Sequence, residues 1–369
     1  MNTKNQGFFF ALVAAILFGA STPAAKFLLK ENDPWLTAGL LYFGSGVGIF
    51  SLSLVFRIFG KEISHDEKLT QQSIPWIAAA TFFGGICGPV LLMIGLSQTT
   101  ATSSSLLLNL ESVFTTLLAW FVFKENFDRR IALGTLCILL GGIFLSWGGN
   151  PNLSSLRGPL FVAAACLCWA LDNNFTRKIS GHHPVQLVTI KSIIAGGANI
   201  SLALALGSKL PGTQQILEAS VVGLLGYGFS LVSFILALRH IGAARTGAYF
   251  SLAPFVGSGI SIVFLGDNIN SIIIIATCFM AMGVWLHLTE NHGHTHEHNE
   301  IEHTHTHEHD EHHLHEHSDP ASNSNSNSNS YSNSTSTSLA TTKHSHPHKH
   351  THLRHAHTHF PDIHHQHSH

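Results

Sequence analysis

Charged residues are scarce in the first 288 positions of this 369-residue chain. Only 16 Lys and Arg and 11 Asp and Glu occur there, less than a tenth of the residues, whereas soluble domains carry about a quarter. This shortage excludes a globular enzyme with a water-facing surface. No phosphate-binding loop, nucleophile triad or zinc-protease motif occurs, so we expect no enzyme, no required cofactor and no nucleic-acid partner. Five cysteines, all in apolar stretches, argue against a disulfide framework.

Long apolar segments fill the charge-poor region. A helix needs about 20 mostly apolar residues to cross a bilayer. The sequence predicts ten such helices, at 8–28, 36–56, 75–96, 102–123, 131–147, 159–178, 185–206, 216–238, 246–264 and 270–288. The expected fold class is therefore an all-α protein of the cell (inner) membrane, with a disordered tail over 289–369.

The orientation follows from Lys and Arg in the predicted loops. One side carries eleven of them and the other carries only Lys30, Arg157 and Lys209. Basic residues accumulate in cytoplasmic loops, so both termini are expected in the cytoplasm.

Similar phrases recur in the two halves, 8–147 and 158–288. Phe18-Gly19-Ala20 precedes Lys26 in the first half, and Trp169-Ala170-Leu171 precedes Arg177 in the second. Because each half has five helices, the second copy must cross the membrane in the opposite sense. Inverted repeats of this kind occur in many secondary transporters, which bind substrate near the midplane.

These patterns resemble the drug/metabolite transporter superfamily, specifically the EamA-type ten-helix transporters. The resemblance covers about residues 8–288 and rests on three phrases: 18–23 with Lys26, the small-residue run 95–102, and Phe123-Lys124-Glu125 followed by Gly134 and Gly141-Gly142. The second half repeats the pattern at 237–244. The resemblance implies transport of a small metabolite by alternating access. One departure is Glu111, which stands near the place where the second half keeps Pro254.

Ionisable residues at membrane depth are the first site candidates, because each costs at least about 2.5–3.5 kcal/mol to insert. Glu111 falls roughly 13 Å below the outer edge of a ~30 Å core. Asp172 and Lys191 fall at one depth on consecutive helices and can form an ion pair. That pair can line the substrate cavity or only join two helices. Glu111 has no partner at its depth unless Lys191 extends to it, which makes it a candidate for binding and releasing a proton.

Four uncharged residues complete the predicted transport cavity. They are Asn109, Asn173, Trp169 and Tyr227. Each has an alternative structural role, because polar side chains in membrane helices often join helices and aromatic ones often only pack.

The tail holds 24 of the 29 histidines, in two blocks separated by a Ser/Asn linker at 322–342. Imidazoles suit zinc, nickel, cobalt and copper, and a flexible chain can wrap such ions. A low-complexity expansion and a pH-sensitive polyelectrolyte are the alternatives. The predicted ligands are His292, His294, His296, His298, His303, His305, His307, His309, His344, His346, His348 and His350.

Three functions compete at this point. The first is a transporter that moves a small polar or amino-acid-like solute, with export favoured, and has a metal-binding tail. The second is a nickel, cobalt or zinc exporter supplied by the tail, although the helices contain no cluster of histidines. The third is a membrane-anchored metal sensor or buffer. The sequence leaves the substrate and the coupling ion open, and a homodimer is one of the oligomeric states it allows.

Overall fold

The computed structural model divides the chain into a helical unit and a second unit, Asn291–His359, which contains the strands. The described residues are 3–58, 70–121, 129–147, 156–177, 179, 184–289, 293–298, 301–307, 344–350 and 353–358. In chain order the helical elements are α1 (Thr3–Leu28), α2 (Pro34–Ile58), η1 (Gln71–Ser73), α3 (Ile74–Ala80), η2 (Thr81–Cys87), α4 (Gly88–Gln98), α5 (Ala101–Leu107), α6 (Leu110–Phe121), α7 (Arg129–Trp147), α8 (Arg157–Arg177), α9 (Pro184–Ala205), α10 (Thr213–Gly223), η3 (Leu224–Phe229), α11 (Ser230–Phe250), α12 (Ala253–Leu265) and α13 (Ser271–Leu288).

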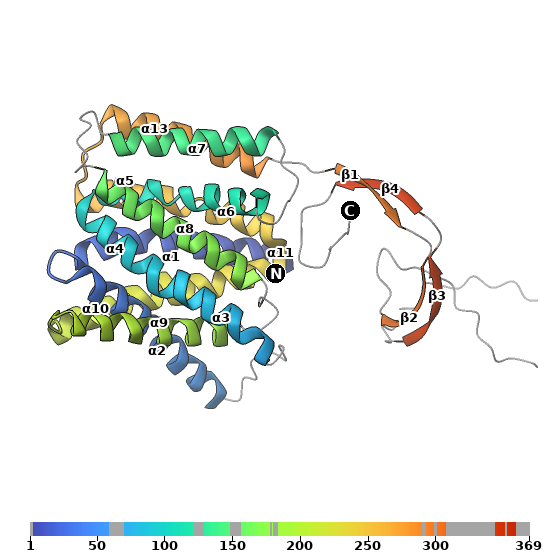
Figure 1. The fold of residues 1–369 in the computed structure, drawn as a ribbon, viewed down its shortest axis with the longest axis horizontal. Coiled ribbons are helices and arrows are strands. Elements are labelled where there is room, and N and C mark those ends of the chain that lie inside the picture. Colours follow the sequence, from blue (N-terminus) through green and yellow to red (C-terminus); the bar gives the residue numbers. More distant parts are fainter. Residues whose placement is uncertain are drawn as a thin grey trace, which may run out of the picture. The chain divides into compact units, whose positions relative to one another are not determined.

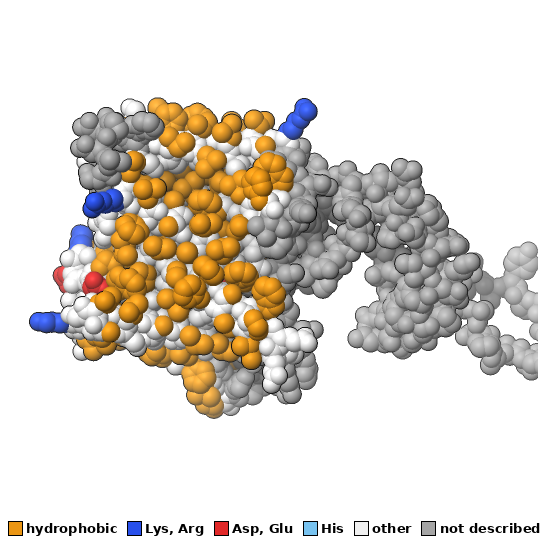
Figure 2. Space-filling model, in the orientation of Figure 1, with side chains coloured by type: hydrophobic (Ala, Val, Ile, Leu, Met, Phe, Trp, Pro, Cys, Tyr) orange, Lys and Arg blue, Asp and Glu red, His pale blue; other side chains and the backbone are white. Residues whose placement is uncertain are grey.

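The flank of the helical unit, by which we mean the surface that runs along the helices between their ends, is apolar. Large side chains such as Phe9, Leu133, Val263 and Trp285 are more than half exposed. Figure 2 shows hydrophobic side chains covering this flank, while the Lys, Arg, Asp and Glu side chains appear toward the ends of the helices. Exposed apolar area of this extent is unfavourable in water and suits the hydrocarbon core of a bilayer.

Seven helical stretches among the described residues are long and apolar enough to cross a membrane. The sequence predicts ten, and the three others fall where helices are interrupted or polar. The predicted span 102–123 is divided into α5 and α6, and 246–264 combines the end of α11 with the short α12. The span 159–178 lies within α8, which contains Asp172, Asn173 and Asn174. Polar residues and breaks, rather than missing helices, account for the difference.

The two halves of the helical unit pack against each other reciprocally. Helix α1 packs on α11, and α8, the first helix of the second half, packs on α4 (Figure 1). Other contacts between the halves include those of α2 with α9 and α10, of α7 with α13, and of α12 with α1 and α5. Helices α1 and α8 are equivalent in the two halves, and so are α4 and α11. The contacts α1–α11 and α8–α4 are therefore equivalent, which is the pattern that a twofold relation between the halves produces.

Both halves interrupt one span at the same place. In the first half the break between α5 and α6 contains Asn109, whose side-chain and backbone amides donate to the Leu106 carbonyl at 3.0 and 3.1 Å. In the second half the break precedes Pro254, which lacks an amide donor. Glu111 and Pro254 are each the second residue of the helix that follows, α6 or α12.

Both halves also widen one span into a π-helix. Element η2 lies between α3 and α4, and η3 lies between α10 and α11. A π-turn shifts the backbone hydrogen bonds from i→i+4 to i→i+5 and leaves a carbonyl for other donors. Glycines at these positions allow close contact, since a Cβ on Gly84 would overlap the Asp172 carboxylate and one on Gly226 would overlap Ser21.

Parts of the tail that the sequence predicts to be disordered are described as strands. Four strands are described there: β1 (Gly293–His298), β2 (Ile301–His307), β3 (His344–His350) and β4 (Leu353–Thr358). They pair antiparallel as β1 with β4 and β2 with β3. Alternating His-x-His sequences have the period of two that a strand requires, although two-stranded ribbons are marginally stable alone. The linker 322–342 lies outside the described residues.

Candidate functional site

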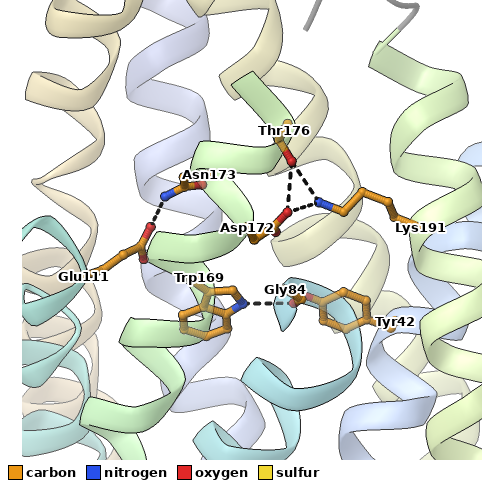
Figure 3. Close-up of polar contacts among 8 residues, drawn as sticks. All are labelled: Tyr42, Gly84, Glu111, Trp169, Asp172, Asn173, Thr176 and Lys191. Carbon is orange, nitrogen blue, oxygen red and sulfur yellow. Dashed lines mark hydrogen bonds and ion pairs between the residues drawn. The ribbon is translucent and has the colours of Figure 1, made fainter. Parts of the chain in front are cut away.

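A group of polar side chains is gathered around the C-terminal part of α8. Trp169, Asp172, Asn173 and Thr176 lie within two successive turns of this helix and point toward neighbouring helices (Figure 3). Asp172 points toward α9 and Asn173 toward α6. Helix α8 therefore joins groups from both halves of the protein.

Asp172 and Lys191 form the ion pair that the sequence predicted. Lys191 Nζ lies 2.5 Å from Asp172 Oδ1, and the two side chains are 8% and 14% exposed. Thr176 adds to the pair, because its hydroxyl donates to Asp172 Oδ1 at 2.9 Å and accepts from Lys191 Nζ at 3.3 Å. A buried pair requires such additional hydrogen bonds to offset desolvation.

Glu111 has a partner, contrary to the expectation that it has none at its depth. Asn173 Nδ2 donates to Glu111 Oε1 at 2.6 Å (Figure 3). Lys191, the suggested alternative, is instead bound to Asp172. The expectation failed because span positions give depth but not the direction of a side chain around α8. Asn173 is a neutral amide, so it solvates the Glu111 charge without neutralising it.

The π-helix η2 supplies a carbonyl to this site. Gly84 O accepts from Tyr42 Oη at 2.9 Å and from Trp169 Nε1 at 3.0 Å. Asn199 donates to the neighbouring carbonyls of Gly85 and Ile86 at 3.3 and 3.4 Å. The sequence analysis did not predict these contacts, because it considered ionisable, amide and aromatic side chains and not backbone carbonyls. The available signal was the glycine pair Gly84-Gly85 within an otherwise large-residue apolar segment.

Four aromatic rings meet beside Gly84. Tyr42 lies 5.1 Å from Tyr227 between ring centroids, and Phe18 lies 5.9 Å from Tyr227 and 6.0 Å from Trp169. Phe18 and Tyr42 belong to the first half, and Trp169 and Tyr227 to the second. We call these four residues the ring cluster. The structure thus brings the predicted Trp169 and Tyr227 together and adds two rings that the prediction omitted.

Asn109 is not part of this arrangement. Its amide reaches the Leu106 carbonyl and lies 3.8 Å from the Met280 sulfur on α13. Glu111, two residues later, is bound to α8. Asn109 therefore has a visible structural function at the break between α5 and α6.

Two charged groups fix the helix ends on the side opposite the N-terminus. Lys26 Nζ donates to the carbonyls of Leu96 and Thr99 at 2.6 and 2.8 Å, near the end of α4. Asp267 accepts from the amide and hydroxyl of Thr102 at 2.9 and 2.8 Å, at the start of α5. Each charge has the sign that complements its helix terminus. Lys26 is thus held by protein carbonyls instead of extending to lipid headgroups.

The predicted metal ligands divide by position. His292 and His309 lie outside the described residues, and the other ten are in the strands. The strand register places His303 opposite His348, His305 opposite His346 and His307 opposite His344. Among the residues whose side chains are described, no group of three His, Cys, Asp or Glu is placed to hold a metal ion.

Together, the apolar flank, the long helices and the charged groups inside the helical unit define a multi-pass membrane transporter. Residues 5–147 and 156–289 match the EamA-like transporter family. The chain belongs to this family, which is one of transporters and not of enzymes.

Curated relatives and a solved structure are consistent with this assignment. The chain is 25% identical to an uncharacterized transporter of Methanothermobacter thermautotrophicus over 76% of its own length and 85% of the relative's. It is 26% identical to a probable amino-acid metabolite efflux pump of Salmonella typhimurium over 76% and 94%. A solved structure at 15% identity superposes with a TM-score of 0.57, covering 78% of this chain and 98% of that one, which shows the shared fold.

Proposed function

We propose that this protein exports a small polar, amino-acid-like metabolite by alternating access. The observation that carries the proposal is the hydrogen bond from Asn173 of the second half to Glu111 of the first. This bond supports the proposal because it joins an ionisable group of the first half to the second half, and inverted-repeat transporters bind substrate between their halves. The similarity to a probable amino-acid metabolite efflux pump supports the substrate class.

The proposed topology has ten spans, with both termini in the cytoplasm. The halves 8–147 and 158–288 each contribute five, counting α5 with α6 and the end of α11 with α12 as interrupted spans. Discontinuous helices are common around transport sites, because an unwound turn presents backbone groups to a substrate. The excess of Lys and Arg on one side supports the orientation in the cell (inner) membrane.

In the proposed mechanism the two halves rock around the site and Glu111 binds and releases a proton or a cationic group. The bond to Asn173 breaks when the halves separate, so occupancy of Glu111 is linked to the conformation. Asp172, Lys191, Trp169 and Tyr227 complete the transport site. Asn109 is assigned a structural role at the helix break.

The test is solute flux in liposomes with the purified protein. Glu111→Gln keeps an oxygen that accepts from Asn173 but cannot be ionised. We expect the variant to fold and to lose the response of flux to a pH gradient. Glu218→Gln is the matched control, because that carboxylate accepts from Gln214 on the exposed surface of α10. Unchanged coupling in Glu111→Gln would remove Glu111 from the mechanism.

We also propose that the His-rich tail binds zinc, nickel, cobalt or copper ions. The paired register of β2 and β3 supports this, because it sets histidines opposite each other at every second position. Binding by the tail suits a reservoir or sensor on the cytoplasmic side. A metal exporter supplied by the tail is the second candidate, and a membrane-anchored metal sensor or buffer is the third.

Truncation after Glu290 tests the tail and separates these candidates. We expect the helical unit to keep its thermal stability, because the strands form a separate unit. Zinc binding, measured by calorimetry, should fall sharply while metabolite flux survives. A metal exporter would instead lose efficiency at low metal concentration and recover as the concentration is raised. Full zinc binding by the truncated protein would place the ligands in the helices.

A further inference from the structure

The three ionisable groups around α8 do not balance. Lys191 and Asp172 neutralise each other, whereas the partner of the Glu111 carboxylate among the described residues is the neutral Asn173 amide. The three groups together carry one net negative charge when all are ionised. An uncompensated charge away from water is unfavourable, and a bound cation removes that cost.

The ring cluster lies beside this excess charge. Trp169 of the cluster and Asn173, which holds Glu111, are four residues apart on α8 and therefore share one face of that helix (Figure 3). The faces of aromatic rings attract cations, and Tyr and Trp do so more strongly than aliphatic side chains of similar size. Two rings come from each half, so a group held among them contacts both halves.

One polar atom of the ring cluster has no partner among the described residues. Tyr227 is 5% exposed and its hydroxyl makes no hydrogen bond. Ser21 donates its own proton to the Phe18 carbonyl at 2.6 Å, so it can accept from the Tyr227 hydroxyl but leaves the Tyr227 oxygen without a donor. A buried hydroxyl without a partner costs free energy and requires an explanation. A ligand with N–H donors would provide the partner.

We propose that the ring cluster and Glu111 bind a substrate that carries a protonated amine, an inference that rests on the proposed transport function. The ammonium group donates to the Glu111 carboxylate and the Tyr227 hydroxyl. The ring faces contact the charged group and the adjoining carbon atoms of the substrate. A free carboxylate on the substrate is accommodated only where it approaches Lys191. Purely anionic solutes are excluded, because they add to the net negative charge.

Binding to the full-length protein in detergent micelles tests the charge preference. Calorimetry compares two series of matched probes: phenethylammonium, 2-phenylethanol and phenylacetate, then butylammonium, butanol and butyrate. We expect at least one ammonium compound to bind about tenfold more tightly than its alcohol, and neither carboxylate to bind. The proposal is overturned if an alcohol or a carboxylate binds as tightly as its ammonium counterpart, or if neither ammonium compound binds.

Two variants locate the binding. Tyr227→Phe removes only the unpartnered hydroxyl, and we expect about fivefold weaker ammonium binding with no loss of alcohol binding. Tyr249→Phe removes a hydroxyl outside the ring cluster and should change nothing. Phe18→Leu should weaken ammonium binding about tenfold by removing one ring face. Equal effects of Tyr227→Phe and Tyr249→Phe would overturn the assignment.

Liposome counterflow distinguishes failure of this inference from failure of the transport function. If a sugar or a carboxylate is transported and no amine is, the proposed amine preference is wrong but the proposed transport function stands. No flux of any solute from a broad panel would overturn both. Flux of amines alone would support both.

Discussion

The contact between α8 and η2 and the contact between α1 and η3 are counterparts in the two halves, yet they carry different chemistry. In the first, Gly84 faces Asp172, whose carboxylate is bound to Lys191 and Thr176. In the second, Gly226 faces Ser21, whose hydroxyl only returns to the Phe18 carbonyl of its own turn. The glycine and the π-turn are shared, but the charge is not.

A similar difference separates the two interrupted spans. The turn after the break carries Glu111 in one half and Pro254 in the other. Proline suffices to interrupt a helix, so the break itself does not require a carboxylate. The repeated features therefore build the scaffold, and the residues that break the symmetry are the ones to test for function.

The largest effect should come from breaking the Asp172–Lys191 ion pair, which belongs to the α8–η2 contact. Lys191→Met leaves the Asp172 carboxylate buried without its cation, which typically costs about 3–5 kcal/mol. Chemical unfolding in mixed micelles measures the loss. Adding Asp172→Asn should recover most of it, because no unpaired charge then remains. Lys209→Met, in an exposed turn, should stay within about 0.5 kcal/mol of the unmodified protein.

A smaller effect is expected from filling the space at Gly84. In Gly84→Ala the new Cβ overlaps the Asp172 carboxylate, so the ion pair must shift. We expect a loss of about 1–3 kcal/mol, the usual cost of overpacking, together with reduced flux. Gly197→Ala is the matched control on a neighbouring helix, because nothing lies within 4 Å of a Cβ at that position. Equal stability of the two variants would contradict the described contact.

The sequence predicted the helical class, the two halves and the Asp172–Lys191 pair, because apolar length and depth are local properties of a chain. It did not predict the partner of Glu111, since Asn173 and Asp172 are adjacent in sequence and only the rotation of α8 decides which helix each one faces. Nor did it predict the carbonyl of Gly84, because the glycine pair marks close packing but does not show that the backbone there forms a π-turn. Tyr42 was overlooked for the same reason: its hydroxyl matters only once η2 presents that carbonyl.

The smallest effect should come from Ser21→Ala, in the uncharged contact between α1 and η3. The substitution keeps the Cβ that packs against Gly226 and removes a hydroxyl that donates to the Phe18 carbonyl of the preceding turn. Such local hydrogen bonds contribute little to stability, so we expect a change below about 0.5 kcal/mol and unaltered flux. Asp172→Ala, at the counterpart position, should abolish flux in the same liposome assay, because Lys191 then remains buried without its anion. A loss of flux in Ser21→Ala comparable to that in Asp172→Ala would show that the two contacts act as equivalent halves of one site, and that the charge difference between them does not carry the function.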